Sequence, residues 1–102
     1  MQKQTTVNQI EIAGDGSIGV RLAKQIVDDD GTVLSSQWHR TLMPPGTDID
    51  AQMAAVNASL TGMNAAAVAP ADIDRIKAYA ITAWTVDAIA AYAAKAAAEQ
   101  AA

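Results

Sequence analysis

The sequence contains no cysteine, no phenylalanine and only one histidine among its 102 residues. Without cysteine there is no disulfide framework, and no thiolate can act as a nucleophile or a zinc ligand. Aromatic residues make up only 4% of the chain. Much of the 51% hydrophobic content is alanine, which contributes little apolar area. These absences leave a core that depends on few large side chains, and they leave few groups for catalysis.

Long hydrophobic runs are also missing. No apolar stretch approaches the roughly 18 residues of a membrane span, and the first residues, MQKQTTVNQ, lack the apolar region of a signal peptide. We therefore expect a soluble protein without membrane contact. The net charge of −4, with scattered Lys and Arg, gives no basic patch for nucleic acid. A chain of this length forms one small domain with a marginal core, so association with other copies would stabilise it.

The composition changes near residue 46, at a Pro-Pro-Gly sequence. We predict an α+β fold in one compact domain, with a three-stranded antiparallel β-meander over residues 1–46. Residues 47–102 are predicted to form two or three helices, of which the last is rich in alanine. The expected core consists of Ile10, Ile12, Ile18, Val20, Leu22, Ile26, Leu34, Trp38, Leu42, Ile73, Ile76, Trp84 and Ile89.

Alternation of apolar and polar residues predicts strands at about residues 6–13, 17–28 and 32–43. A loop of Gly14, Asp15 and Gly16 would place Ile12 opposite Ile18. Such a three-residue hairpin loop requires a positive φ at its last position, which glycine supplies.

The second predicted turn uses the same device, with Asp29, Asp30 and Gly31 as its loop. It would place Ile26 opposite Leu34 and Leu22 opposite Trp38. One pair fails, because Val20 would then face Arg40. A bulge or a frayed strand end would remove this conflict.

The helical part is expected to open at Thr47, with Asp50 completing a capping box, and to stop near Gly62 and Asn64. A second helix would follow the loop that ends at Pro70. A break at residues 83–85 would separate it from a last helix over residues 86–100, with Thr85 as its N-cap.

A competing interpretation starts from GDGSIG at residues 14–19, which matches the G-x-G-x-x-G fingerprint of dinucleotide-binding folds. In that interpretation residues 17–28 form a helix, which the helical spacing of Ile18, Leu22 and Ile26 would support. Three observations oppose it. Glu11 and Gln9 interrupt the strand that should be buried on both faces, no acid lies about 20 residues further on, and no later strands follow. Arg40 could still accept a 2′-phosphate, so this nucleotide-binding alternative stays open.

The sequence predicts no catalytic residues, no cofactor-binding residues, no bound cofactor and no metal ligands, and hence a protein that is not an enzyme. The acidic run at residues 28–30 lacks the twelve-residue spacing of an EF-hand and is explained by turn formation. His39 has the opposite strand parity to Trp38 and is expected to face solvent or a partner. Candidate interface residues are Trp38, His39, Arg40, Trp84, Ile89 and Tyr92.

Four segments together resemble a family of small uncharacterised proteins encoded in tail and tail-fibre gene clusters of tailed bacteriophages and prophages. These segments are IEI..DGSIGVRLAKQIVDDDG at 10–31, WHR at 38–40, PPGTD at 44–48 and WTVDAIAAY at 84–92. The resemblance implies a structural protein of the virion tail, baseplate or tail fibre, made in the host cytoplasm. Its partners would be other phage structural proteins and further copies of itself. A small intracellular assembly chaperone or binding module is the alternative. The resemblance also favours the hairpin interpretation of residues 14–19.

Overall fold

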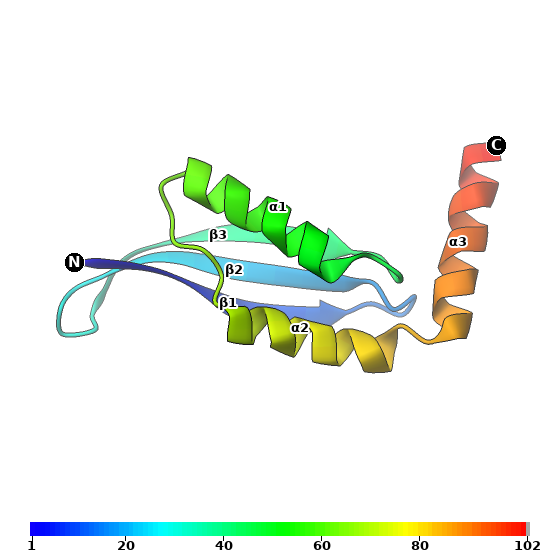
Figure 1. The fold of residues 1–102 in the computed structure, drawn as a ribbon, viewed down its shortest axis with the longest axis horizontal. Helices are drawn as coiled ribbons and strands as arrows, with labels where there is room; N and C mark the ends of the chain where they lie inside the picture. The colour runs from blue at the N-terminus through cyan, green and yellow to red at the C-terminus, as the bar shows by residue number, and fades with distance from the viewer. Residues whose placement is uncertain (102) are drawn as a thin grey trace.

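The computed structural model describes residues 1–101 as a three-stranded antiparallel sheet followed by three helices (Figure 1). This confirms the predicted α+β fold and the order β1-β2-β3 of the meander. The elements are β1 (Gln2–Ile12), β2 (Ile18–Val27), β3 (Val33–Met43), α1 (Ile49–Gly62), α2 (Pro70–Ala83) and α3 (Val86–Ala101).

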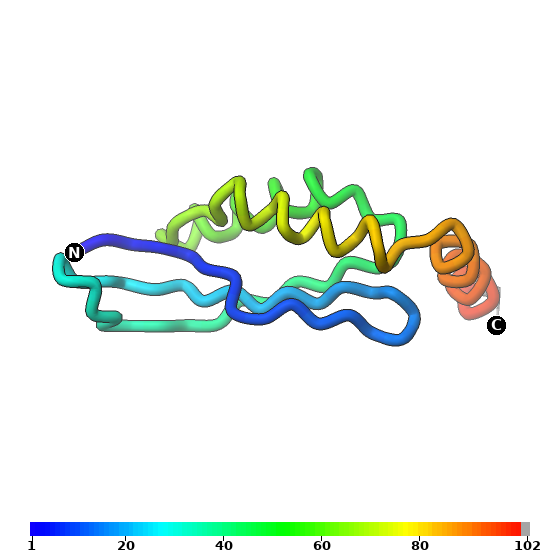
Figure 2. The backbone as a smooth tube through the Cα atoms, turned by 90° about the horizontal axis from the view of Figure 1, so that it is seen from below, coloured from blue at the N-terminus to red at the C-terminus, as the bar shows by residue number. Residues whose placement is uncertain are grey.

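The molecule has two layers over most of its length. Helices α1 and α2 cover one face of the sheet, and within residues 1–101 no helix covers the opposite face (Figure 2). Helix α3 lies across the end of the sheet where β1 turns into β2 (Figure 1). The resulting shape is elongated, with extents of 51 × 27 × 20 Å.

The first hairpin forms as predicted, with Ile12 opposite Ile18 and Ile10 opposite Val20. The Ala13 carbonyl accepts from the Gly16 N–H at 2.9 Å, and Gly16 has a φ of 91°. Because β2 is extended where the dinucleotide fold requires a helix, the interpretation of residues 14–28 as the start of a dinucleotide-binding fold is wrong.

The second hairpin repeats the turn but shifts the register. The Asp28 carbonyl accepts from the Gly31 N–H at 2.9 Å, and Gly31 has a φ of 89°. An irregularity at the start of β3 then leaves Leu34 without a direct partner, so Ile26 lies opposite Ser35. This bulge removes the predicted conflict, because Val20 lies opposite Thr41 instead of Arg40.

The bulge overturns part of the predicted core. The expected pairs of Ile26 with Leu34 and of Leu22 with Trp38 are wrong, and Leu22 lies opposite His39. Six expected core residues are exposed, namely Ile12, Ile26, Leu34, Trp38, Leu42 and Ile89. The buried cluster between sheet and helices contains four of the expected residues, Ile18, Val20, Leu22 and Ile76, together with Met43, Ile49, Met53, Val56, Leu60, Val68 and Ala80.

The helix boundaries lie close to the predictions, with one correction. The side chain of Asp48, rather than Thr47, caps α1 by accepting from the Ala51 N–H at 3.1 Å. Thr47 instead donates its hydroxyl to the Pro44 carbonyl at 2.7 Å. Helix α2 begins at Pro70, and the Thr85 hydroxyl caps α3 by accepting from the Ala88 N–H at 3.1 Å.

Candidate interaction site on the open face of the sheet

The register determines which side chains point away from α1 and α2. Residues paired with the outward side of β2 are Gln4, Thr6, Gln9 and Glu11 on β1 and Ser36, Trp38, Arg40 and Leu42 on β3. Their partners on β2 are Gly19, Arg21, Ala23 and Gln25. We call this surface, without a covering helix, the open face. Trp38 is 53% exposed on it and Leu42 is 63% exposed.

Arg21 occupies the middle of the open face and is held from two sides. Its guanidinium carbon lies 4.5 Å from the centre of the Trp38 ring, which is a cation–π contact. Its Nε donates to the Asn8 Oδ1 at 2.8 Å, and Asn8 is the unpaired residue of a bulge in β1. The bulge therefore turns a polar side chain toward Arg21 and fixes the arginine against the indole.

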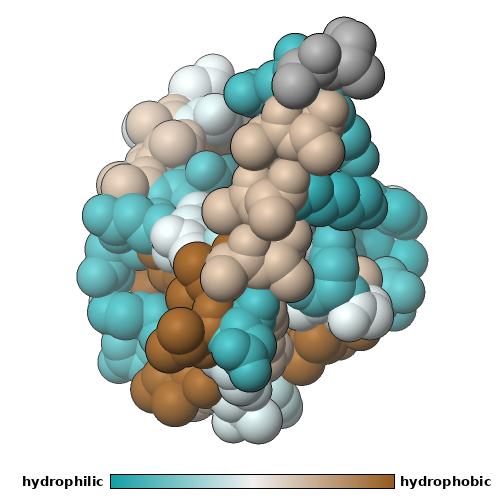
Figure 3. Space-filling model, turned by 90° about the vertical axis from the view of Figure 1, so that its right-hand side faces the viewer, coloured by the Kyte–Doolittle hydropathy of each residue, from teal (hydrophilic) through white to brown (hydrophobic). Residues whose placement is uncertain are grey.

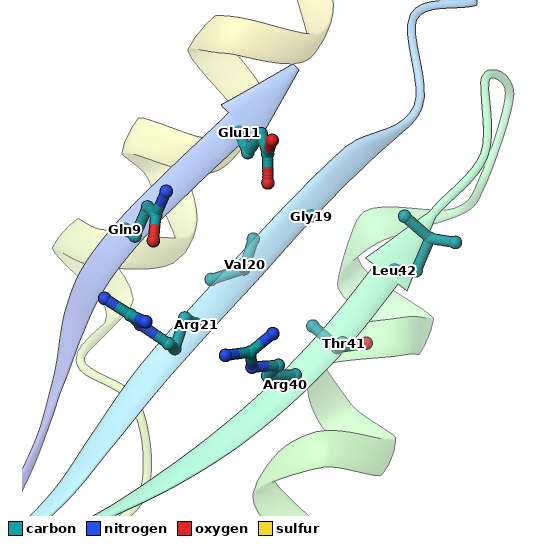
Figure 4. Close-up of a pocket in the computed structure, with 8 residues that line it drawn as sticks. All are labelled: Gln9, Glu11, Gly19, Val20, Arg21, Arg40, Thr41 and Leu42. Carbon is teal, nitrogen blue, oxygen red and sulfur yellow. The ribbon is translucent and has the colours of Figure 1, made fainter. Parts of the chain in front are cut away.

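A shallow groove of about 310 Å³ crosses the sheet over Gly19. In Figure 4, Glu11 and Leu42 stand on either side of Gly19, and Arg21 and Arg40 lie further along the strands. A Cβ atom at residue 19 would lie 3.9 Å from the Glu11 carbonyl oxygen and 4.0 Å from Leu42 Cδ1. The groove exists because glycine places no side chain between these two neighbours.

The open face brings two positive charges, those of Arg21 and Arg40, close together. Arg21 and Arg40 are direct cross-strand partners, a pairing of like charges that is unfavourable in a sheet. Among the residues that the structure describes, Arg21, Arg40 and Glu11 take part in no ion pair. A chain of net charge −4 thus presents two cations next to an exposed tryptophan. This arrangement can bind a carboxylate of another molecule beside an apolar side chain.

The structure divides the six candidate interface residues into two groups. Trp38 and Arg40 lie on the open face, while His39 has the opposite strand parity and is half-buried on the helix-covered face. Trp84 lies between α2 and α3, and Ile89 and Tyr92 lie on α3, at the end of the molecule where these helices meet the first hairpin turn.

The second group attaches α3 to the sheet. The Trp84 Nε1–H donates to the Gly16 carbonyl at 2.7 Å. Ile89 lies against Gly46, since a Cβ on that glycine would be 3.4 Å from Ile89 Cγ2. Tyr92 is half-buried and lines a hollow beside Gly14 and Asp15. These residues therefore have structural contacts within the chain.

Two exposed residues at the base of α3 were not predicted. Ile81 is 81% exposed and Val86 is 84% exposed, on the two sides of the break between α2 and α3. Figure 3 shows hydrophobic surface gathered beside the lower part of this helix.

The six turn residues occupy the two hairpin loops, as the sequence predicts. Asp15 and Asp30 accept from the backbone N–H groups of Ser17 and Thr32, each at 2.9 Å. The carboxylate of Asp29 lies 3.1 Å from the amino group of Met1.

The fold and the site define an α+β protein whose sheet has one covered and one open face. Comparison of the chain with protein-family models, with curated proteins and with solved structures gave no match. Within the described residues no cluster of three or more metal-ligating side chains occurs. None of the helices described has the length and hydrophobicity to cross a membrane.

Proposed function

We propose that this protein is a non-enzymatic structural component that acts through protein–protein contacts in a symmetric assembly. The open face of the sheet is the contact surface. The main observation in support of this proposal is that Trp38, at the centre of β3, is exposed and lies beside the pair Arg21 and Arg40.

The side chains on the open face are those that contribute most to protein interfaces. Tryptophan and arginine are enriched among the residues whose truncation weakens binding most. Arg21 is already oriented by Trp38 and Asn8, so binding would cost less side-chain entropy there. The cross-strand repulsion of Arg21 and Arg40 would be relieved by an acidic side chain from the partner.

The assembly we propose is the tail region of a tailed bacteriophage, in the tail, baseplate or fibre. This part of the proposal is supported by the resemblance of residues 10–31, 38–40, 44–48 and 84–92 to proteins of phage tail gene clusters. An assembly chaperone that leaves the finished particle is the alternative, and one experiment separates the two.

The test is mass spectrometry of purified particles of a phage that carries this gene. We expect the wild-type chain in particles, and a Trp38→Ala variant at about one tenth of the wild-type level or less. Tyr79→Ala is the matched control, because Tyr79 is an aromatic residue on α2 that is 46% exposed. A chain present in the lysate but absent from particles would overturn the structural role and favour the chaperone. Equal incorporation of both variants would overturn the assignment to the open face.

A further inference from the structure

We infer that two copies of this chain pair antiparallel through β3 and form one continuous six-stranded sheet. The inference builds on the proposed function, since it names a second copy as the first partner. It follows from the condition of the two sheet edges and from the order of side chains along β3.

Strands β1 and β3 are both edges, but they differ in protection. Edge strands in natural proteins commonly carry bulges, lysine or proline that prevent pairing with other chains. β1 has a bulge at Asn8 in its middle and Lys3 near its start. β3 has its irregularity only at its beginning, contains neither proline nor lysine, and pairs regularly with β2 from Ser35 to Met43. By these criteria β3 is the less protected of the two edges, and we infer that it is the one another strand extends.

Two-fold symmetry restricts the register of such a pair. An antiparallel pairing of identical strands around an axis perpendicular to the sheet places one residue opposite itself. Trp38 is the midpoint of the strand from Val33 to Met43. Centring the pair on Trp38 is the register that uses the whole length of β3, including Val33 and Leu34 at its irregular start.

This register is also chemically self-complementary. On the open face Leu42 lies opposite Leu34 of the second copy, and Arg40 lies opposite Ser36. On the helix-covered face His39 meets Gln37 and Thr41 meets Ser35. Apolar residues meet apolar ones, and no like charges face each other, which are the favourable cross-strand combinations.

Neighbouring registers lose this match. A pair centred on Arg40 would set that arginine against its own copy, which is unfavourable. A pair centred on His39 would set Leu42 opposite Ser36. The tryptophan-centred register alone brings the two exposed indoles together, where aromatic pairs add to the stability of a sheet.

Sedimentation equilibrium tests the dimer. We expect the wild-type chain to be a dimer at tens of micromolar, and Trp38→Lys to weaken dimerisation about 100-fold, because two like charges replace two indoles at the axis. Tyr79→Lys places the same charge on α2 and should leave dimerisation unchanged. A wild-type chain that stays monomeric up to millimolar concentration overturns the inference.

Disulfide formation tests the register, since the natural chain has no cysteine. Ser36→Cys and Arg40→Cys chains, when mixed and mildly oxidised, should form a mixed dimer at least about 10-fold faster than either variant alone. Residues 36 of the two copies would be about 14 Å apart, beyond disulfide reach. Equal rates in the mixture and in the separate variants overturn the register. These results are independent of particle incorporation: a monomer found in particles retains the proposed function, and a dimer absent from them retains the β3 pairing.

Discussion

Gly16 and Gly31 hold equivalent places in the two hairpin turns but differ in their surroundings. Both have φ near 90°, where side chains with a Cβ are strained. A Cβ on Gly31 would have open space around it, whereas one on Gly16 would lie 3.1 Å from the Ala83 carbonyl oxygen. Substitutions at the two glycines therefore separate the free-energy cost of the backbone conformation, which both share, from the cost of packing, which applies only at Gly16.

We predict that Gly31→Ala lowers the free energy of unfolding by about 1–2 kcal/mol, from the left-handed conformation alone. Gly16→Ala should lower it by more, because the corner between α2 and α3 must also move. Urea denaturation of the two variants measures both losses. Equal losses would show that the turn does not pack against this corner.

The two turn aspartates predict a dependence of stability on pH. The backbone N–H of Ser17 lowers the pKa of Asp15 below its ordinary value of 3.8, chiefly by hydrogen bonding to the carboxylate. Hydrogen bonds from Thr32 likewise lower the pKa of Asp30. A carboxyl whose pKa is lower in the folded state stabilises the fold above its unfolded pKa, and this contribution disappears as pH falls through the folded value.

Stability should therefore decline as the pH falls below about 4, where these groups begin to be protonated. Urea midpoints between pH 7 and pH 2 measure this decline. The Asp15→Asn and Asp30→Asn double variant should show a shallower decline, and an Asp87→Asn variant, at the start of α3, serves as the control. An unchanged slope in the double variant would contradict the assignment.

At the scale of elements, the anchoring of α3 depends on Trp84. No residue of α3 whose side chain is described is buried, so this helix adds little to the core. The hydrogen bond from Trp84 to the Gly16 carbonyl, between residues 68 positions apart in the chain, is the polar contact among those that attach this end of the chain to the sheet.

Trp84→Phe should lower the free energy of unfolding by about 1 kcal/mol or somewhat more, because the part-buried Gly16 carbonyl loses its donor. Trp38→Phe is the control, since phenylalanine keeps an aromatic face for Arg21 and the position is exposed. Thermal denaturation of both variants, at a concentration where the chain is monomeric, provides the comparison. A Trp38→Phe loss as large as that of Trp84→Phe would contradict the anchoring role.

The elements that the sequence predicts well are those with local signals. The Asp-Gly turns, Pro70 at a helix start and the break at Thr85 each depend on a few neighbouring residues. The position of Trp38 depends on a bulge at Leu34, and a one-residue shift moves every later side chain of β3 to the other face. The predicted pairing of Val20 with Arg40 indicates that the strand contains an irregularity, but the sequence does not specify at which residue it occurs.

The sequence predicts only part of the candidate site, because the other part depends on the strand register. Trp38 and Arg40 are candidates by residue type, because tryptophan and arginine are common in interfaces. Arg21, Asn8 and Gly19 join them only through strand pairing, which needs the register of both hairpins. Burial of Met43, Met53 and Val56 was missed because the expected core favoured isoleucine, leucine and tryptophan.

At the scale of the whole molecule, an elongated chain limits how copies can associate. The radius of gyration of 15.8 Å exceeds the roughly 13 Å of a compact 100-residue domain. The two long surfaces are the helix layer and the open face, and the exposed base of α3 lies at one end (Figures 1 and 3). Side-by-side and end-to-end dimers therefore differ strongly in overall size.

Small-angle X-ray scattering distinguishes the two arrangements. Pairing through β3 places the centres of two three-stranded sheets about 15 Å apart, which raises the radius of gyration only to about 17–18 Å. Association through Ile81 and Val86 at the end near α3 would separate the centres by nearly the 51 Å length of the molecule. The radius of gyration would then approach 30 Å, by the same addition of squared distances. We predict the smaller value, and the Trp38→Lys variant should return to the monomer value of 15.8 Å. A dimer near 30 Å would assign self-association to the apolar base of α3 and leave the open face free for a different protein.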